Sequence, residues 1–202
     1  MAAAAPAAAA RAVAGKIQAK AMTTEQLLKA LHEALGPDLK SVVLFGSAAA
    51  GDFVEGVSGR DILIVAEKLG SVELGALSAP LARWRQAGNP QPQLFAAREL
   101  ANSADVFPIE LTDMQQARQV LFGDDPVADI KIEMYHFRLQ VERELKSRLL
   151  LLRKNYLACH GRTADIARVM TASVSTFLVL FRAALRLYDE SPPPPQKVAA
   201  LE

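Results

Sequence analysis

The sequence predicts an α/β (α+β) fold, a small mixed-sheet domain followed by a C-terminal antiparallel helical hairpin. Two short apolar segments, 41–45 and 61–65, have the length and β-branched content of buried strands, and helical patterns flank them. Beyond Gly123 the apolar spacing changes to three and four residues and keeps that period to Tyr188. Short strands alternating with helices indicate an α/β layer, and the long helical repeat indicates a second, helical unit.

Composition excludes several classes of protein. The 202 residues are 51% hydrophobic, enough for a packed core, and the net charge of +1 gives no general signature of a nucleic-acid or membrane-surface binder. The single cysteine, Cys159, excludes an internal disulfide framework and favours a reducing, cytoplasmic setting. The longest uncharged apolar stretch, 169–181, is shorter than the roughly 20 residues of a membrane span. We therefore expect neither a transmembrane helix nor a nucleic-acid or membrane partner.

The chain divides by composition and charge. The first segment carries +3, residues 23–130 carry −7, and residues 131–190 carry +5. Opposite charges favour docking of the helical part on the α/β part. The predicted regions are a disordered Ala-rich arm (1–22), the α/β domain (23–125), the helical hairpin (126–190) and a Pro-rich tail (191–202).

A helix cap, glycines and prolines mark where the elements of the α/β part begin and end. A capped amphipathic helix begins at Thr24 and is stopped by Gly36-Pro37. Pro80 should break or kink a helix, and Pro108 places its strand at an edge or a bulge because it cannot donate to a ladder. The expected elements after the two strands are a helix at 71–86, a loop at 88–92, a short helix at 98–102 and a third strand at 105–111.

Two apolar stripes predict the hairpin, one from Met134 to Tyr156 and the other from Ile166 to Tyr188. His160-Gly161-Arg162 forms the turn between them. Two helices bury little surface by themselves, so the hairpin completes a bundle alone, with a second copy in a homodimer, or with a protein partner.

The segment between the two strands is the candidate site. The first strand runs into Gly46-Ser47, a short helix follows, and the second strand opens with Asp61. A glycine there lets a phosphate approach the backbone, and Ser47 can offer its hydroxyl and a free N–H at a helix start, where the dipole favours an anion. A carboxylate on the next strand can hold the Mg²⁺ that bridges nucleotide phosphates.

With these residues the sequence resembles the nucleotidyltransferase superfamily, the DNA polymerase beta-like fold of MNT and kanamycin nucleotidyltransferase-like domains. The resemblance covers about residues 41–112, including LFGSAAAGDFVEGVSGRDILIV, and the family's third acid would be Glu110. It implies a nucleoside triphosphate as substrate with Mg²⁺ or Mn²⁺. Gly46 and Ser47 would bind the phosphates, and Asp61 and Glu110 would bind the metal and act as the catalytic residues.

Two departures from the family pattern concern the acids and an arginine. The family has two carboxylates two residues apart on the second strand, whereas here either Gly59 or Leu63 replaces one of them; Ser58, in the place of the family's serine, favours Gly59. Ala50 replaces a frequent arginine. A second metal ion would be poorly held unless Asp52 or Glu55 folds inward. Losing one group that stabilises charge in the transition state costs on the order of a hundredfold in rate.

Three functions stay open at this point. The lead hypothesis is an NTP–Mg-binding nucleotidyltransferase that modifies a hydroxyl of a small molecule or protein, with Glu110 helping to deprotonate the acceptor. The second is a pseudoenzyme of the same fold, acting as a nucleotide sensor or an antitoxin-like protein-binding module. The third is a helical interaction protein that dimerises through the two apolar stripes.

Overall fold

The computed structural model describes residues 22–51 and 59–188. The predicted Ala-rich arm up to residue 21, the Pro-rich tail, and Asp52, Glu55 and Ser58 lie outside the described residues. The elements are α2 (Thr24–Leu35), a 3₁₀ turn (Gly36–Asp38), β1 (Leu39–Phe45), α3 (Ser47–Ala50), β2 (Asp61–Ala66), α4 (Ser71–Gln86), β3 (Gln93–Ala96), α5 (Ala97–Ala101), α6 (Pro108–Gln116), β4 (Arg118–Gly123), α7 (Met134–Ala158) and α8 (Thr163–Leu185).

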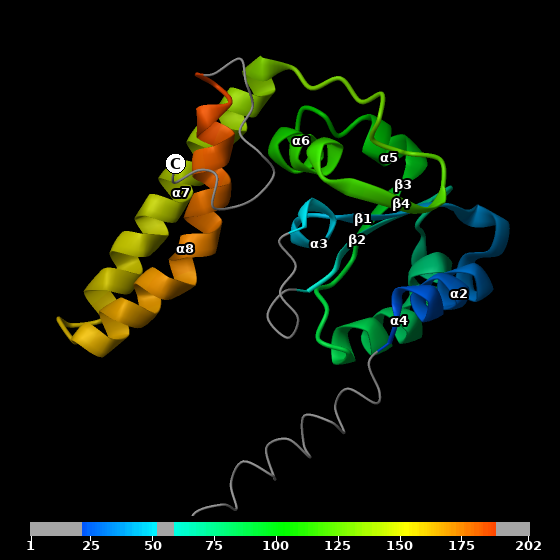
Figure 1. The fold of residues 1–202 in the computed structure, drawn as a ribbon, viewed down its shortest axis with the longest axis horizontal. Helices are drawn as coiled ribbons and strands as arrows, with labels where there is room; N and C mark the ends of the chain where they lie inside the picture. Colours follow the sequence, from blue (N-terminus) through cyan, green and yellow to red (C-terminus); the bar gives the residue numbers. More distant parts are fainter. Residues whose placement is uncertain (1–21, 52–58, 189–202) are drawn as a thin grey trace, which may run out of the picture.

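The four-stranded sheet has the order β3-β2-β1-β4 (Figure 1). The central strand β1 is antiparallel to both β2 and β4, while β2 and β3 are parallel, so the predicted mixed sheet is confirmed. At the end of β1, Phe45 lies opposite Asp61 on one side and Arg118 on the other. The chain leaves the sheet there and enters α3.

Helices α2 and α4 cover one face of the sheet (Figure 1). The α2 helix begins where expected because Thr23 and Gln26 form a capping box, each side chain accepting the other's backbone N–H. The helix α4 spans Ser71–Gln86 as predicted, and it continues through the buried Pro80 without the break that was one of the two expected effects. The core on this face contains Leu27, Leu31, Val42, Ile62, Ile64, Leu77, Leu81 and Trp84.

The opposite face is covered by α5 and α6, and here the predicted third strand at 105–111 is wrong. Pro108 starts a helix instead, because proline is well suited to the first helical position and lacks an N–H that would stay unpaired there. The sheet takes its outer strands from β3 and β4, which were not predicted. The core on this face contains Val43, Leu63, Val65, Leu100, Leu111, Met114 and Val127.

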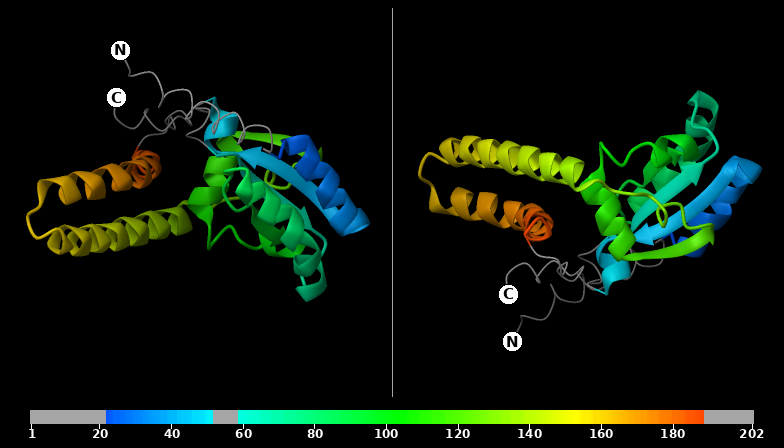
Figure 2. Two further views of the ribbon diagram at one scale, coloured as in Figure 1. Left: turned by 90° about the horizontal axis from the view of Figure 1, so that it is seen from below. Right: turned by 90° about the horizontal axis from the view of Figure 1, so that it is seen from above.

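The long helices α7 and α8 form the predicted antiparallel hairpin, which projects from the sheet domain and touches it near its base (Figure 2). Ile109 of α6 packs there against Phe137 and Val141 of α7 and against Leu180 and Ala183 of α8. By length and composition alone, α8 is apolar enough to cross a membrane, and 6% of the relevant window is buried.

Candidate functional site

The centre of the candidate site is the turn between β1 and α3. Gly46 has φ 71° and ψ −148°, a conformation that L side chains rarely adopt, and its carbonyl oxygen accepts hydrogen bonds from the N–H groups of Ala49 (3.1 Å) and Ala50 (2.9 Å). Ser47 is thereby the first residue of the short α3 helix. The predicted strand, Gly-Ser turn and helix are confirmed.

Asp61 lies directly beside this turn. It opens β2 opposite Phe45, and a Cβ atom built on Gly46 would stand 2.9 Å from its Oδ2 atom. Side chains alternate along a strand, so Asp61 shares the face of Leu63, which is covered by α6. The structure therefore brings Gly46 and Asp61 together, as the motif predicts, and a side chain at position 46 would be strained by its φ of 71° and would displace the carboxylate.

The loop at 88–92 packs against Gly59, the favoured position of the missing acid. A Cβ atom on Gly59 would clash with Cδ of Pro90, and it would lie 3.1 Å from Cγ of the same ring. Asn89, beside Pro90, accepts a hydrogen bond from the Arg60 backbone N–H at 3.2 Å. The predicted loop at 88–92 thus packs on the entry to β2 at Gly59, the position that Ser58 favours over Leu63 for the missing acid.

Glu110 lies in the first turn of α6 rather than on a strand beside Asp61, which corrects the sequence-based expectation. Its Oε2 atom accepts a hydrogen bond from Nε2 of Gln140 at 2.7 Å, while Oε1 of Gln140 accepts the backbone N–H of Ile109 at 2.8 Å. Gln140 therefore ties the start of α6 to α7. Glu110 also lines an open cavity of about 320 Å³, with Glu144, Arg148 and other residues of α7 and α8.

Sequence reasoning missed an ion cluster between α6 and α8. Arg182 donates to Oδ2 of Asp113 at 2.7 Å, and Arg186 lies 3.6 Å from Oδ1 of the same carboxylate and also bonds Gln116. The two arginine side chains are only 7% and 6% exposed. Burial lowers the pKa of the Arg186 guanidinium, and Asp113 opposes this effect. Asp113 thus fixes α8 to the sheet domain.

The residues present fit one metal ion better than two. Within 22–51 and 59–188 there is no group of three or more His, Cys, Asp or Glu side chains that could hold a metal. Mg²⁺ is often held by one or two carboxylates together with phosphate oxygens and water. Asp61 lies beside the turn at Gly46 and can supply one carboxylate, and Glu110 lies on α6, where it is bonded to Gln140. A pair of ions held by protein carboxylates does not fit the described residues.

No family model and no curated protein sequence matches this chain. Several solved structures are similar to it, including the following three. A toxin–antitoxin structure with AMP-PNP has a TM-score of 0.40 and 20% identity, covering 64% of this chain and 99% of that one. A mutant of the toxin–antitoxin MntA-HpeT has a TM-score of 0.37 and 18% identity, with the same coverage. Spectinomycin adenyltransferase from Enterococcus faecialis, with ATP and spectinomycin, has a TM-score of 0.44 and 13% identity, covering 89% of this chain and 96% of that one.

Proposed function

We propose that the chain is a nucleotidyltransferase-like protein that binds a nucleoside triphosphate with Mg²⁺ or Mn²⁺ at the end of β1. The contact between Gly46 and Asp61 carries this proposal. It places a carboxylate, a ligand that Mg²⁺ prefers, beside a side-chain-free backbone turn that a phosphate can approach. Ser47 contributes its hydroxyl and backbone N–H to the phosphates.

Each residue of this site has a role in the proposal. Asp61 would hold one ion, which neutralises phosphate charge when bound. In the transfer step, a hydroxyl oxygen of the acceptor forms a bond to the α-phosphorus while the bond to pyrophosphate breaks, and the hydroxyl proton passes to water. The acceptor is a small molecule or a protein. The buried Cys159 accords with a cytoplasmic setting.

Nucleotide binding tests the proposal. Isothermal titration of the full chain with ATP at millimolar Mg²⁺ should show saturable binding, and Asp61→Asn should weaken it by at least about tenfold because the ion loses its charged ligand. The matched control is Glu67→Gln, just beyond the other end of β2, where the carboxylate forms a surface pair with Lys40 at 3.2 Å. Absence of binding in the wild type would overturn the proposal.

One observation favours the second candidate, a pseudoenzyme of the same fold that senses nucleotide or binds a protein. Pro90 occupies the space that a carboxylate at position 59 would need. Pyrophosphate release with each of the four NTPs separates the two candidates. Release that is lost in Asp61→Asn supports the transferase, and ATP binding without release supports the sensor.

A further inference from the structure

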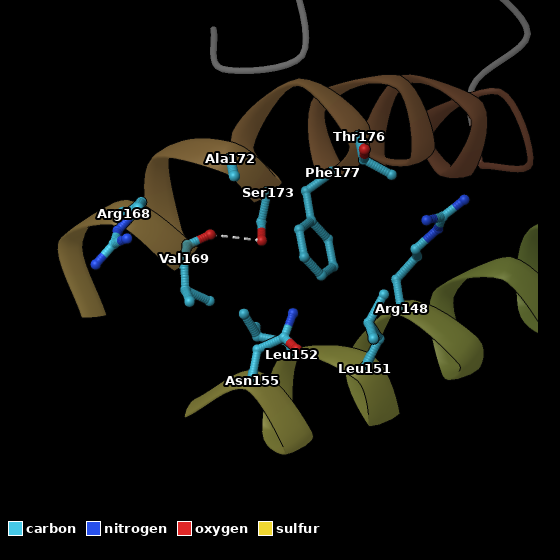
Figure 3. Close-up of a pocket in the computed structure, with 10 residues that line it drawn as sticks. All are labelled: Arg148, Leu151, Leu152, Asn155, Arg168, Val169, Ala172, Ser173, Thr176 and Phe177. Carbon is cyan, nitrogen blue, oxygen red and sulfur yellow. Dashed lines mark hydrogen bonds between the residues drawn. The ribbon is translucent and has the colours of Figure 1, made fainter. Parts of the chain in front are cut away.

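The two faces of α8 have different surroundings. Figure 3 shows Phe177, Ser173 and Val169 directed from α8 toward Leu151, Leu152 and Asn155 of α7, around a cavity of about 270 Å³. A second apolar row lies on the neighbouring side of α8, where the Phe181 ring contacts that of Phe177 with centroids 5.8 Å apart, and we call this row the outer stripe of α8. Its members are 62%, 51%, 45%, 42% and 91% exposed, in the order Met170, Val174, Phe181, Leu185 and Tyr188.

The four helical members lie on one side of α8 because their spacings of 4, 7 and 4 residues return to nearly the same angle at 100° per residue, and Tyr188 follows in the turn after the helix ends. The outer stripe also carries no charge. The charged residues of α8 point elsewhere: Asp165 pairs with Arg162 and Arg168, and Arg182 pairs with Asp113. No element within residues 22–51 and 59–188 covers this row, and an uncovered apolar row of this length is unusual for a helix surface.

We infer that the outer stripe of α8 docks against the same stripe of a second copy of the chain, so that two hairpins form a four-helix bundle. A two-fold contact places the same surface patch of both copies together. An uncharged patch allows this because no like charges meet. The outer face of α7 is different, since its exposed Leu139, Leu150 and Leu157 alternate with basic side chains such as Lys146 and Arg153. Two copies of that face would place like charges together.

The exposed area of the outer stripe agrees with a second copy of the chain as its partner. At about 200 Å² for a fully exposed large side chain, the outer stripe leaves roughly 600 Å² open, and a stable interface buries about 800 Å² on each partner. Exposed small residues beside the stripe, Ala164, Ala167 and Thr171, supply further area and allow close approach of a second helix. A membrane is the less suitable occupant, because Arg182 holds α8 to Asp113 of the sheet domain.

The oligomeric state of the full chain tests this inference. Sedimentation velocity across a wide concentration range should show a dimer. Met170→Glu/Val174→Glu places charges in the outer stripe, far along α8 from Asp113, and should raise the dimer dissociation constant by at least about a hundredfold. The control variant Leu150→Glu/Leu157→Glu changes equally exposed positions of α7 and should remain a dimer. Circular dichroism of both variants checks that the helices are retained.

Three results would overturn the inference: a wild-type monomer at all concentrations, dissociation by the α7 variant but not by the α8 variant, or a monomer that co-sediments with phosphatidylcholine vesicles through the outer stripe. The inference does not depend on the proposed function. ATP titration of the α8 variant should be unchanged, so loss of the dimer and loss of nucleotide binding are distinguishable outcomes.

Discussion

The carboxylate of Asp61 lies against the backbone of Gly46, with its Oδ2 atom 2.9 Å from the position that a Cβ atom would take. This contact joins the end of β1 to the start of β2 across the register pair Phe45 and Asp61. It places a potential metal ligand next to the turn that opens α3. Because the two residues are 15 positions apart in sequence, the contact depends on the antiparallel pairing of β1 with β2.

Gly46→Ala should impair both folding and nucleotide binding. The added methyl meets the Asp61 carboxylate, and φ of 71° is unfavourable for alanine, so we expect a loss of about 1–3 kcal/mol in the free energy of unfolding. Urea unfolding and ATP titration measure the two effects. Gly75→Ala is the matched control: its Cβ meets nothing within 4 Å in α4, and it should stabilise the chain by about 0.5–1 kcal/mol. Equal stability of the two variants would contradict the prediction.

Asp113→Ala should weaken the attachment of the hairpin. The substitution leaves the buried guanidinium groups of Arg182 and Arg186 without their carboxylate, a change that costs about 3–5 kcal/mol. Urea unfolding should show this loss. The control is Glu142→Ala, which removes an exposed pair with Lys146 and should leave the free energy of unfolding nearly unchanged. A loss for Asp113→Ala as small as that of the control would show that the cluster is dispensable.

The sequence predicts the elements whose signals are local. Thr23 caps α2, apolar β-branched runs mark β1 and β2, and the period of three and four marks both long helices. The error at 105–111 has a local cause as well: apolar Val106, Phe107 and Ile109 suggest a strand, but Pro108 is a helix-start signal, and Glu110 in the first turn supports it.

Features that depend on long-range packing could not be predicted. β3 has only four residues, and β4 is an edge strand with mixed polarity, so neither carries a strong strand pattern. The Asp113–Arg182 pair spans 69 positions. Likewise, the sequence shows that Gly59 carries no carboxylate, whereas only the structure shows that the Pro90 ring lies where a side chain at position 59 would be.

The start of α4 should respond to acid. Hydrogen bonds from the backbone N–H groups of Glu73 itself and of Gly70 lower the pKa of the Glu73 carboxyl, and Lys68 adds a smaller effect. A lowered pKa in the folded state stabilises the fold above the ordinary pKa of 4.5, and this contribution is lost as pH falls through the folded value. The stability advantage of the wild type over Glu73→Gln should therefore be constant near neutrality and shrink below about pH 4.5.

Unfolding free energies measured at several pH values test this. Lys68→Gln is the control, because it removes only the smaller electrostatic cause and should keep most of the pH dependence. A stability advantage of the wild type over Glu73→Gln that grows as pH falls would contradict the lowered pKa of Glu73.

The last prediction concerns whether the second carboxylate can be restored. Gly59→Asp alone should destabilise the chain and give no gain in pyrophosphate release, because its Cβ clashes with the Pro90 ring. Gly59→Asp/Pro90→Gly removes the obstacle and leaves Asn89 to accept the Arg60 N–H. Position 59 lies two residues before Asp61, on the same side of an extended segment. The double variant should therefore show Mg²⁺-dependent pyrophosphate release above that of Pro90→Gly. Equal release in these two variants would show that the loop at 88–92 is not what separates this site from a two-ion transferase.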